Sequence, residues 1–539
     1  MEGRTVLQRG ERKLHFRISA ILTALFLSQP LLELWAAPPH SSLQEKIKRG
    51  EVVVPKHDLE ISQKELSELG FDLSRFKPSA PSVAGPFRML VLLVDFSDER
   101  AQTAPVSFDS LLFSKTQSSV RRYYLENSYG VLDLVTVNYP SALGWRRAPQ
   151  SSSYYADSNY GLGSYPQNAR KLVEDAVDLA DPLVNFADYD NNADGYVDGV
   201  AVVHAGPGAE YTGNSNDIWS HKWAITPRLK DGVYVYSYTM EPEYWISPGD
   251  MTIGVFCHEF GHLIGNLPDL YDLDGGSQGI GRWSLMAGGT WNGNMGSSPS
   301  HFDAWCKIRL GFAASNVVSS DRTAVPIPSA EKSKAGIFRL WTDGSQGPEY
   351  FLVENRQRTG YDAALPSSGL LIWHIDDTVS TTNRRPWYPP NSPATGHYQV
   401  ALVQADNLYH LEKNLNGGDA GDPFPGSTTN RTFNSASLPN SLSYTGLPSF
   451  VRVENISASK DTMTADLFVR GSSCVAIKGD LNGDAALTAA DVSLLLSCVF
   501  QSLGNCNLCV ADVDCDGTLA PGDLVLQLNA VFLALPFPC

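Results

Sequence analysis

Six residues near the middle of the chain, Cys257-His258-Glu259-Phe260-Gly261-His262, place two imidazoles and a carboxylate at a spacing that suits metal chemistry. In a helix, residues i and i+4 share a face. His258 and His262 can therefore bind one zinc ion while Glu259 reaches the water that the ion holds. This is the arrangement of a zinc peptidase, in which Glu259 is the catalytic base. Because such short motifs also arise by chance on ordinary helices, the surrounding residues decide whether this one is a metal site.

The residues after the motif supply a turn and a further acidic side chain. Gly265 can end the helix in a conformation with positive φ, and Pro268 prevents its continuation. Asp269 then comes within reach of the metal and is the predicted third zinc ligand, with Asp272 as the alternative. A fourth position stays open for water, as catalytic zinc requires. Met286, between glycine-rich turns, is predicted to pack beneath the metal in a structural role.

These segments resemble the immune inhibitor A family of secreted bacterial metallopeptidases. The likeness covers roughly residues 86–430 and is carried by HEFGHLIGNLPDLYD, WSLMAGG, RMLVLLVDFSD, VRRYYLENSYGVLDL, DGYVDGVAVVHAGPGAE and EYFLVENRQ. The resemblance implies a zincin-type domain in which His258, His262 and Asp269 bind zinc, Glu259 is the general base and Met286 forms the Met-turn. One feature departs from the family pattern: residues 266–268 separate the glycine from the acidic ligand, where the family has two residues.

An additional donor to the substrate carbonyl is a common part of such sites. His221, Tyr271 and His301 are candidates. Each is more often a packed or rim residue, so none of them is assigned.

An acidic loop that precedes the zinc motif alternates oxygen-bearing side chains around a glycine, as EF-hand-type calcium loops do. Its predicted calcium ligands are Asp190, Asn192, Asp194, Tyr196 and Asp198. A surface turn rich in Asn and Asp has the same composition, but the regular alternation favours calcium. We expect a structural ion that fixes the entry of the buried strand that follows.

The C-terminal 66 residues contain two copies of an acidic loop followed by an apolar, helix-like run. The predicted calcium ligands are Asp480, Asn482, Asp484, Thr488 and Asp491 in the first copy and Asp512, Asp514, Asp516 and Asp523 in the second, where Ala520 lacks a side-chain oxygen. The tandem resembles a dockerin domain. That resemblance implies two structural calcium ions and a cohesin-bearing partner, as in polysaccharide-degrading complexes.

Six of the eight cysteines also lie in this region, at positions 474, 498, 506, 509, 515 and 539. A domain this small buries little core, so calcium and disulfide bonds are its expected stabilisers. Cys506 and Cys509 could also form half of a zinc knuckle or a redox motif, but no second CxxC or histidine accompanies them. Cys257 and Cys306 either pair or stay buried and free.

Changes in composition and stretches rich in Gly, Pro, Ser and Asn divide the 539 residues into five segments. We expect a secretory signal at 1–37, a propeptide or N-terminal extension at 38–85, the catalytic domain at 86–325, a β-rich, sandwich-like domain at 326–470 and the dockerin-like domain at 474–539. The predicted class is α+β. A permanent membrane anchor is disfavoured by Gln29, Pro30 and Glu33, and a net charge of −17 without basic clusters argues against nucleic acid.

The leading hypothesis is a secreted, extracellular zinc endopeptidase that a calcium-dependent dockerin attaches to a partner. A non-catalytic binding protein that uses the peptidase-like domain as a recognition surface is the competing class. A zinc hydrolase that acts on non-peptide bonds is a third reading. Glu259 favours catalysis, because a binding protein has no need of a base beside the metal.

Overall fold

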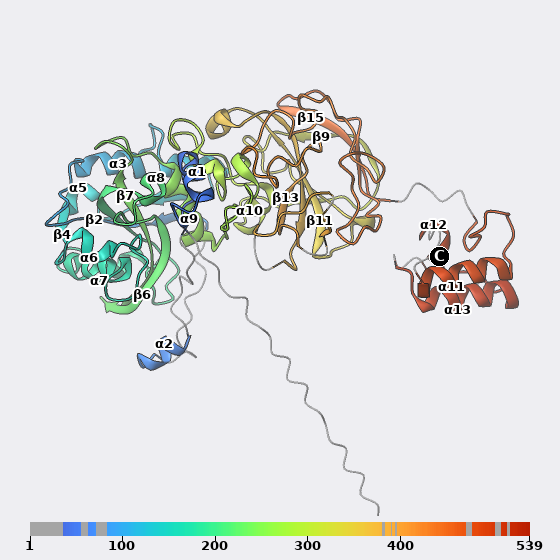
Figure 1. Ribbon diagram of the computed structural model, residues 1–539, viewed down its shortest axis with the longest axis horizontal. Coiled ribbons are helices and arrows are strands. Elements are labelled where there is room, and N and C mark those ends of the chain that lie inside the picture. Colours follow the sequence, from blue (N-terminus) through green and yellow to red (C-terminus); the bar gives the residue numbers. More distant parts are fainter. Residues whose placement is uncertain are drawn as a thin grey trace, which may run out of the picture. The chain divides into compact units, whose positions relative to one another are not determined.

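Five strands form the sheet that carries the metal-site helix, in the order β4-β2-β5-β7-β6 (Figure 1). Their bounds are β2 Leu90–Asp95, β4 Trp145–Arg147, β5 Val200–Pro207, β6 His221–Lys230 and β7 Val233–Tyr244. The first four strands in this order run parallel, and β6 returns antiparallel to β7. β2 and almost all of β5 are buried, as the continuous apolar runs LVLLVD and VAVVHAG predict for strands covered on both faces.

The structure is a computed structural model, and it describes residues 36–54, 63–71, 83–379, 383–389, 391–393, 396–470, 477–501, 508–514 and 518–538. The predicted signal at 1–37 falls almost wholly outside the described residues, and its boundary stays a prediction. Among the residues that are described, no helix is long and apolar enough to cross a membrane.

Helices surround the sheet. They are α3 Pro105–Phe113, α4 Val120–Asn127, α5 Pro140–Leu143, α6 Ser152–Ala156, α7 Ala169–Ala180, α8 Ala209–Thr212, α9 Gly254–Gly265 and α10 Ala304–Arg309. Short 3-10 turns lie at Phe186–Tyr189, Gly281–Trp283 and Gly288–Trp291, and a small parallel pair joins β1 Gly85–Arg88 to β3 Leu132–Val135. α9 packs on β7 and β6 and is buried on every side, which suits its apolar sequence GVFCHEFGHLIG.

A second body of strands follows. Its five-stranded sheet has the order β13-β12-β11-β10-β8 and its three-stranded sheet the order β14-β15-β9. The bounds are β8 Asn316–Val317, β9 Arg322–Pro328, β10 Phe338–Leu340, β11 Glu349–Arg356, β12 Gly369–Asp376, β13 Val400–Leu402, β14 Arg452–Glu454 and β15 Thr462–Phe468, with 3-10 turns at Thr342–Gly344 and Gly360–Ala364.

Alternating side chains bury both faces of the five-stranded sheet. Phe351 and Val353 of β11 face a core that is shared with the three-stranded sheet, whereas Tyr350 and Leu352 join the core of the half that contains α9. The period-2 pattern of YFLVEN therefore makes one face of a sandwich and one face of the contact with the metal-site half. The predicted β-rich, sandwich-like architecture has this form.

An N-terminal part and a C-terminal part complete the described chain. N-terminal to β1 lie a 3-10 turn at Ser41–Leu43 and the helices α1 Gln44–Lys48 and α2 Gln63–Glu68. The C-terminal part contains α11 Ala489–Gln501, α12 Leu508–Ala511 and α13 Pro521–Leu533, and α11 packs against α13. Each of the two predicted acidic loops in the C-terminal part is thus followed by a helix.

Candidate metal centre

α9 holds the two histidines on one face. The ring centroids of His258 and His262 are 4.6 Å apart with an interplanar angle of 88°, and their Nε2 atoms are 3.0 Å apart. Both side chains are fully buried. The i, i+4 spacing of the motif therefore brings two imidazole nitrogens to one point, as the sequence predicts.

Asp269 is the acidic residue that reaches this point. Its Oδ1 lies 3.0 Å from Nε2 of His258 and 3.3 Å from Nε2 of His262. The alternative, Asp272, lies elsewhere, because its carboxylate accepts hydrogen bonds from the Ser277 hydroxyl and the Asp274 amide. The longer spacer of this chain thus still delivers an acidic side chain to the histidines.

The helix ends one residue later than expected. Gly265 is the last helical residue, and Asn266 takes the left-handed conformation with φ 48°. Asparagine tolerates this region because its short polar side chain bonds locally. Gly265 is needed for a different reason: a Cβ there would lie 2.3 Å from Cδ2 of Leu310. The prediction that Gly265 itself supplies the positive φ is wrong.

Hydrogen bonds on the far side of each ring fix its orientation. Nδ1 of His258 lies 2.9 Å from the Leu285 carbonyl and 3.1 Å from the Thr290 hydroxyl, and Nδ1 of His262 lies 2.6 Å from the Leu267 carbonyl. With Nδ1–H donated to a carbonyl, each Nε2 keeps its lone pair for a metal. In addition, Oδ2 of Asp269 is buried and receives no hydrogen bond from any described residue. These donors fit a divalent cation of the zinc type.

The carboxylate of Glu259 has no hydrogen-bond donor among the described residues. Both of its carboxylate oxygens are buried and accept no hydrogen bond within the described parts of the chain. Burial raises the pKa of Glu259 well above its usual value, and the charges of Glu241, Asp269 and Glu210 raise it further. Several buried carboxylates beside two imidazoles form a site that a divalent cation would stabilise electrostatically.

Met286 lies directly beneath α9, as expected for a structural role. It is fully buried, and a Cβ on Gly261 would come within 2.8 Å of its Sδ. The Leu270 amide donates to the Met286 carbonyl at 2.7 Å, which ties the residue after Asp269 to the Met286 segment. Gly261, between the two histidines, therefore allows the helix and this segment to approach closely.

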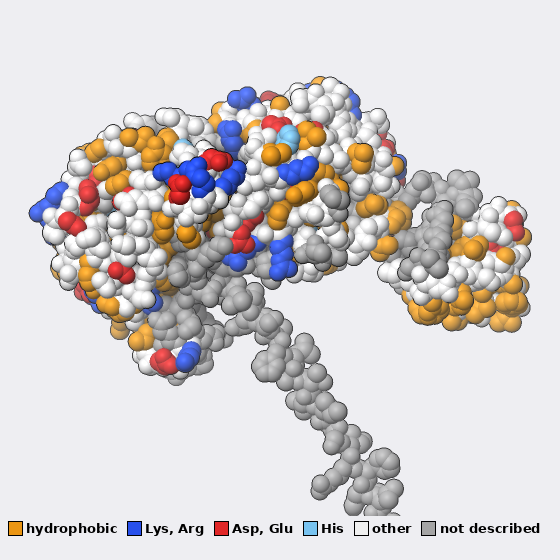
Figure 2. All heavy atoms as spheres, in the orientation of Figure 1, with side chains coloured by type: hydrophobic (Ala, Val, Ile, Leu, Met, Phe, Trp, Pro, Cys, Tyr) orange, Lys and Arg blue, Asp and Glu red, His pale blue; other side chains and the backbone are white. Residues whose placement is uncertain are grey.

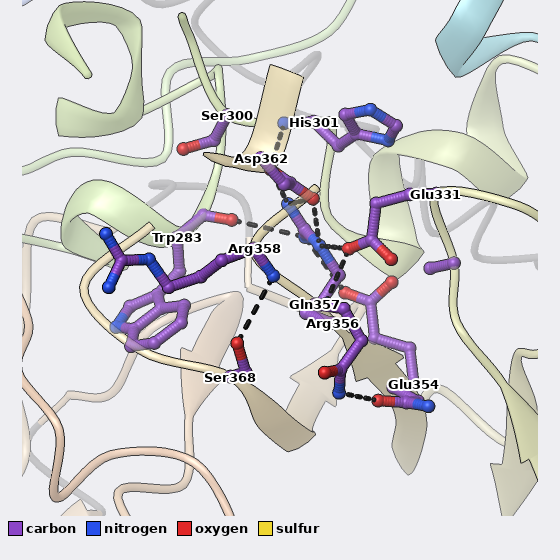
Figure 3. Close-up of polar contacts among 12 residues, drawn as sticks. Trp283, Ser300, His301, Glu331, Glu354, Arg356, Gln357, Arg358, Asp362 and Ser368 are labelled. Carbon is purple, nitrogen blue, oxygen red and sulfur yellow. Dashed lines mark hydrogen bonds and ion pairs between the residues drawn. The ribbon is translucent and has the colours of Figure 1, made fainter. Parts of the chain in front are cut away.

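A buried ion cluster holds the Met286 segment from the β-rich side (Figure 3). Arg356 of β11 donates two 2.7 Å hydrogen bonds to Asp362 and a 3.3 Å hydrogen bond to the Trp283 carbonyl, three residues before Met286. Asp362 in turn accepts the His301 amide at 2.8 Å. The side chain of Arg356 is fully buried.

The N-terminal segment lies against the same site. Ala36 pairs with His221 as an isolated antiparallel bridge, and its carbonyl accepts the Tyr271 hydroxyl at 2.7 Å. The indoles of Trp219 and Trp291 donate to the carbonyls of Ala37 and Pro38, each at 2.8 Å. We refer to residues 36–54 as the N-terminal strap.

A cavity of about 530 Å³ lies beside the strap. It is lined by strap residues and by residues that follow the metal ligands, including Tyr271, Asp272, Arg282 and Trp291. The strap thus forms part of the wall of this cavity, whereas the side chains of His258, His262 and Asp269 are at most 1 % exposed.

The three candidate carbonyl donors have different surroundings. His221 is buried between the Trp219 carbonyl and the Tyr238 hydroxyl, and His301 pairs with Glu126 at 2.8 Å. Both have packing partners. Tyr271 is the candidate that faces the site: the charges of Asp269 and Glu259 add to the effect of burial in raising its pKa well above its usual value.

The acidic loop before β5 folds tightly around its own carboxylates. Oδ1 and Oδ2 of Asp190 accept the amides of Asp194 and Gly195 at 3.1 and 2.9 Å, and Asp198 accepts the Asn191 amide. Gly195 has φ 89°, which the sharp bend requires. Burial and the charges of Asp194 and Asp190 raise the pKa of Asp198 to about 7. The predicted ligands Asn192 and Tyr196 belong to the same turn.

The C-terminal loops are built in the same way. Asp480 accepts amides of its own loop, and Asp491, at the start of α11, accepts the amides of Leu481 and Asn482. In the second copy, carboxylates of Asp512, Asp514 and Asp523 come within 4.8 Å of one another. Asp484 and Thr488 lie in the first loop, whereas Asp516 lies outside the described residues.

Of the six C-terminal cysteines, only Cys498 has a described side chain, so the predicted disulfides remain a prediction. In the catalytic region, Cys257 and Cys306 are buried free thiols rather than a disulfide.

Sequence reasoning missed Thr290 and Trp291. Both follow the Met286 turn in GGTW, and that proximity is the only local signal they carry. Their partners, His258 and Pro38, are 32 and 253 residues away along the chain.

Comparison with known proteins shows which family this part of the chain resembles. Residues 87–312 match the immune inhibitor A peptidase M6 catalytic domain. The pre-pro-metalloprotease PrtV of Vibrio cholerae is 30% identical over 41% of this chain and 29% of its own length. Immune inhibitor A of Bacillus thuringiensis subsp. alesti is 34% identical over 34% of this chain and 30% of its own length. The chain thus spans less than a third of the length of these relatives, and its residues 87–312 are similar to the immune inhibitor A peptidase M6 catalytic domain.

Proposed function

We propose that the protein is a secreted zinc endopeptidase that hydrolyses peptide bonds in proteins. The observation that carries the proposal is the convergence of His258, His262 and Asp269 next to an unpartnered Glu259, within a segment that matches a peptidase family. Bound there, zinc supplies a Lewis acid and lowers the pKa of a coordinated water to near 7.

The residues of the chain then have distinct tasks. Glu259 accepts the proton of the attacking water and passes it to the leaving amine, so one carboxylate acts first as base and then as acid. No covalent link to the enzyme forms. Thr290 and the Leu285 and Leu267 carbonyls hold the rings in the tautomer that leaves Nε2 unprotonated.

Tyr271 is the side chain best placed to donate to a substrate carbonyl. Its hydroxyl donates to a peptide carbonyl, that of Ala36, beside the metal ligands. A substrate peptide in place of the strap would present a carbonyl to the same hydroxyl. A donor at that position stabilises the negative charge that develops on the carbonyl oxygen.

The strap supports a latent form of the enzyme. The carbonyls of residues 36–38 accept hydrogen bonds from Tyr271, Trp219 and Trp291, and of these three residues Pro38 lies beyond the predicted signal at 1–37 and stays with the rest of the strap when the signal is removed. The chain has no cysteine before Cys257. Latency therefore depends on peptide contacts and bulk rather than on a thiolate.

Cleavage of unfolded casein tests this function. We expect activity in protein that lacks residues 36–82, loss of that activity with a zinc chelator and recovery on added zinc. Glu259→Ala should be inactive although it retains zinc. Equal cleavage by Glu259→Ala and the parent protein would refute the mechanism and favour a non-catalytic binding protein. Activity on small esters or amides but not on casein would favour a hydrolase of non-peptide bonds.

We further propose that the acidic loops bind structural calcium and that the C-terminal part is a dockerin. Each of the two C-terminal loops is followed by a helix, and Figure 2 shows apolar side chains gathered on one face of the C-terminal part. The exposed apolar residues of α11 and α13 are Leu494, Leu496, Phe500, Val525, Leu528, Phe532 and Leu533. An apolar face of this kind suits a protein partner. A cohesin should capture the protein in calcium but not in EGTA, and capture that ignores chelation would contradict this assignment.

A further inference from the structure

A third cluster of metal-binding side chains lies in the loop that follows β13. Asp406, His410 and Asp419 each bring a ligand atom within 4.8 Å of the others. Nδ1 of His410 is 2.9 Å from Oδ2 of Asp419. A Cβ on Gly421 would lie 2.2 Å from Oδ2 of Asp406 and 3.1 Å from Oδ1 of Asp419, so both carboxylates lie next to the same glycine.

A buried carboxylate with an unused oxygen stands beside this cluster. Asp422 is 1 % exposed, and its Oδ2 accepts hydrogen bonds from the Trp283 indole and the Asp419 amide, each at 2.9 Å. Its Oδ1 is buried and accepts no hydrogen bond from the residues that the structure describes. Burial raises the pKa of Asp422 to about 7, and the charges of Asp419 and Asp406 contribute. A buried acceptor close to two other carboxylates lacks a positive partner.

We propose that Asp406, His410 and Asp419 hold a divalent cation, with the buried carboxylate of Asp422 as an additional negative charge beside it. Two carboxylates and one imidazole form a mixed oxygen and nitrogen donor set, which suits Mn²⁺ or Zn²⁺ better than the all-oxygen shells that Ca²⁺ and Mg²⁺ prefer. The cation would balance the carboxylate charges of this partly buried loop, which otherwise repel one another.

The position of the loop gives this cation a consequence for the peptidase site. Backbone bonds join the loop to the segment before Met286: the Gln278 amide donates to the Leu411 carbonyl at 2.9 Å, and the Arg282 amide donates to the Gly417 carbonyl at 2.7 Å. Asp422 itself holds the Trp283 indole. A cation in this loop would therefore stabilise residues 278–283, the segment that leads to Met286 beneath α9.

Asp406→Asn tests the proposal, because the amide keeps an oxygen for the Leu408 amide that Asp406 accepts at 2.9 Å. The full-length protein is purified, depleted of metal, and reloaded separately with Mn²⁺, Zn²⁺ or Ca²⁺. Elemental analysis then gives metal per chain, and thermal unfolding gives Tm. We expect the variant to bind one Mn²⁺ or Zn²⁺ fewer than the wild type, with affinity at this site weakened about tenfold or more. Its Tm in metal should be lower than that of the wild type.

The sign of the Tm change separates a cation site from a closed polar loop. Without a cation, Asp406→Asn removes repulsion with Asp419 and Asp422, so Tm rises and the metal content stays that of the wild type; this result would overturn the proposal. If Asp406→Asn folds poorly, metal addition to depleted wild type and to Asp419→Asn gives the same decision, since only the wild type should gain Tm. Asp461→Asn, which removes an exposed pair with Lys332, is the matched control and should change neither quantity.

The outcome of this experiment does not depend on the proposed peptidase function. Metal content and Tm do not require activity, and His258→Ala should remove the metal of the peptidase site while leaving the Asp406 site filled. Loss of both metals in Asp406→Asn would count against two separate sites.

Discussion

Substitution of Arg356 is expected to destabilise the protein more than substitution of an exposed arginine. Its guanidinium lies among three buried carboxylates: it makes two 2.7 Å bonds to Asp362, one of 3.3 Å to Glu354 and an ion pair of 3.5 Å with Glu331 (Figure 3). Arg356 holds the pKa of Asp362 well below its usual range, so Asp362 is charged at neutral pH. Arg356→Met leaves that charge buried and unpaired.

The expected loss of unfolding free energy follows from the Asp362 charge that stays buried after the substitution. Removal of one partner of a buried pair costs about 3–5 kcal/mol. Arg356→Lys keeps the positive charge but loses the second parallel bond to Asp362 and the contact with the Trp283 carbonyl. Because charge-assisted hydrogen bonds contribute about 1.5–3 kcal/mol each, we expect a loss of about 2–3 kcal/mol for the lysine variant.

Urea unfolding of the full-length protein measures these losses, with Arg470→Met as the control. Arg470 makes an exposed pair with Asp343 at 3.3 Å, and pairs of this kind contribute about 0–1 kcal/mol. In the double variant Arg356→Met/Asp362→Asn the buried charge is gone, so part of the loss should be recovered. An Arg356→Met protein as stable as Arg470→Met would refute the reasoning.

Three further predictions concern the strap, the carbonyl donor and a buried acid. Trp291→Phe removes the hydrogen bond to the Pro38 carbonyl, worth about 1 kcal/mol, so peptidase activity of the full-length protein should rise about fivefold, with no such rise in protein lacking residues 36–82. Tyr271→Phe in that shortened protein should lower kcat by about 10²–10³ while zinc content stays the same; unchanged kcat would exclude Tyr271 as a donor. Burial raises the pKa of Glu412 to about 8, so its proton is lost as pH rises through that value and stability should fall by about 2 kcal/mol between pH 6 and 8. Glu412→Gln keeps an acceptor for the Gln404 amide at 2.6 Å and should abolish this fall in urea unfolding, whereas an unchanged pH dependence would assign it to another group.

Local patterns predict those parts of the site that local geometry sets. The i, i+4 spacing of His258 and His262 follows from the helix itself, and the alternation in YFLVEN follows from the pleat of a strand. Asp269 was predicted over Asp272 by its distance along the chain and by the resemblance to the immune inhibitor A family. The geometry supports that choice because Pro268 and the left-handed Asn266 redirect the chain immediately after the helix.

Long-range contacts lie beyond the reach of such patterns. Arg356 meets Trp283 across 73 residues, and Trp291 meets Pro38 across 253. No sequence pattern in either segment predicts which residue it contacts. An arginine at the end of a strand or a tryptophan after a glycine pair fits many environments. The end of α9 was misjudged for a related reason: packing against Leu310, rather than backbone conformation, demands glycine at position 265.

Zinc-edge X-ray absorption on the Asp406→Asn variant, loaded with one zinc per chain, tests the central claim most directly. The account predicts two imidazole nitrogens at about 2.0–2.1 Å and a shell completed by oxygen at about 2.0–2.2 Å, from Asp269 and water. In His262→Ala the signal of one imidazole should disappear. A sulfur neighbour at about 2.3 Å, or a shell without imidazole, would contradict the assignment of His258, His262 and Asp269 as the ligands.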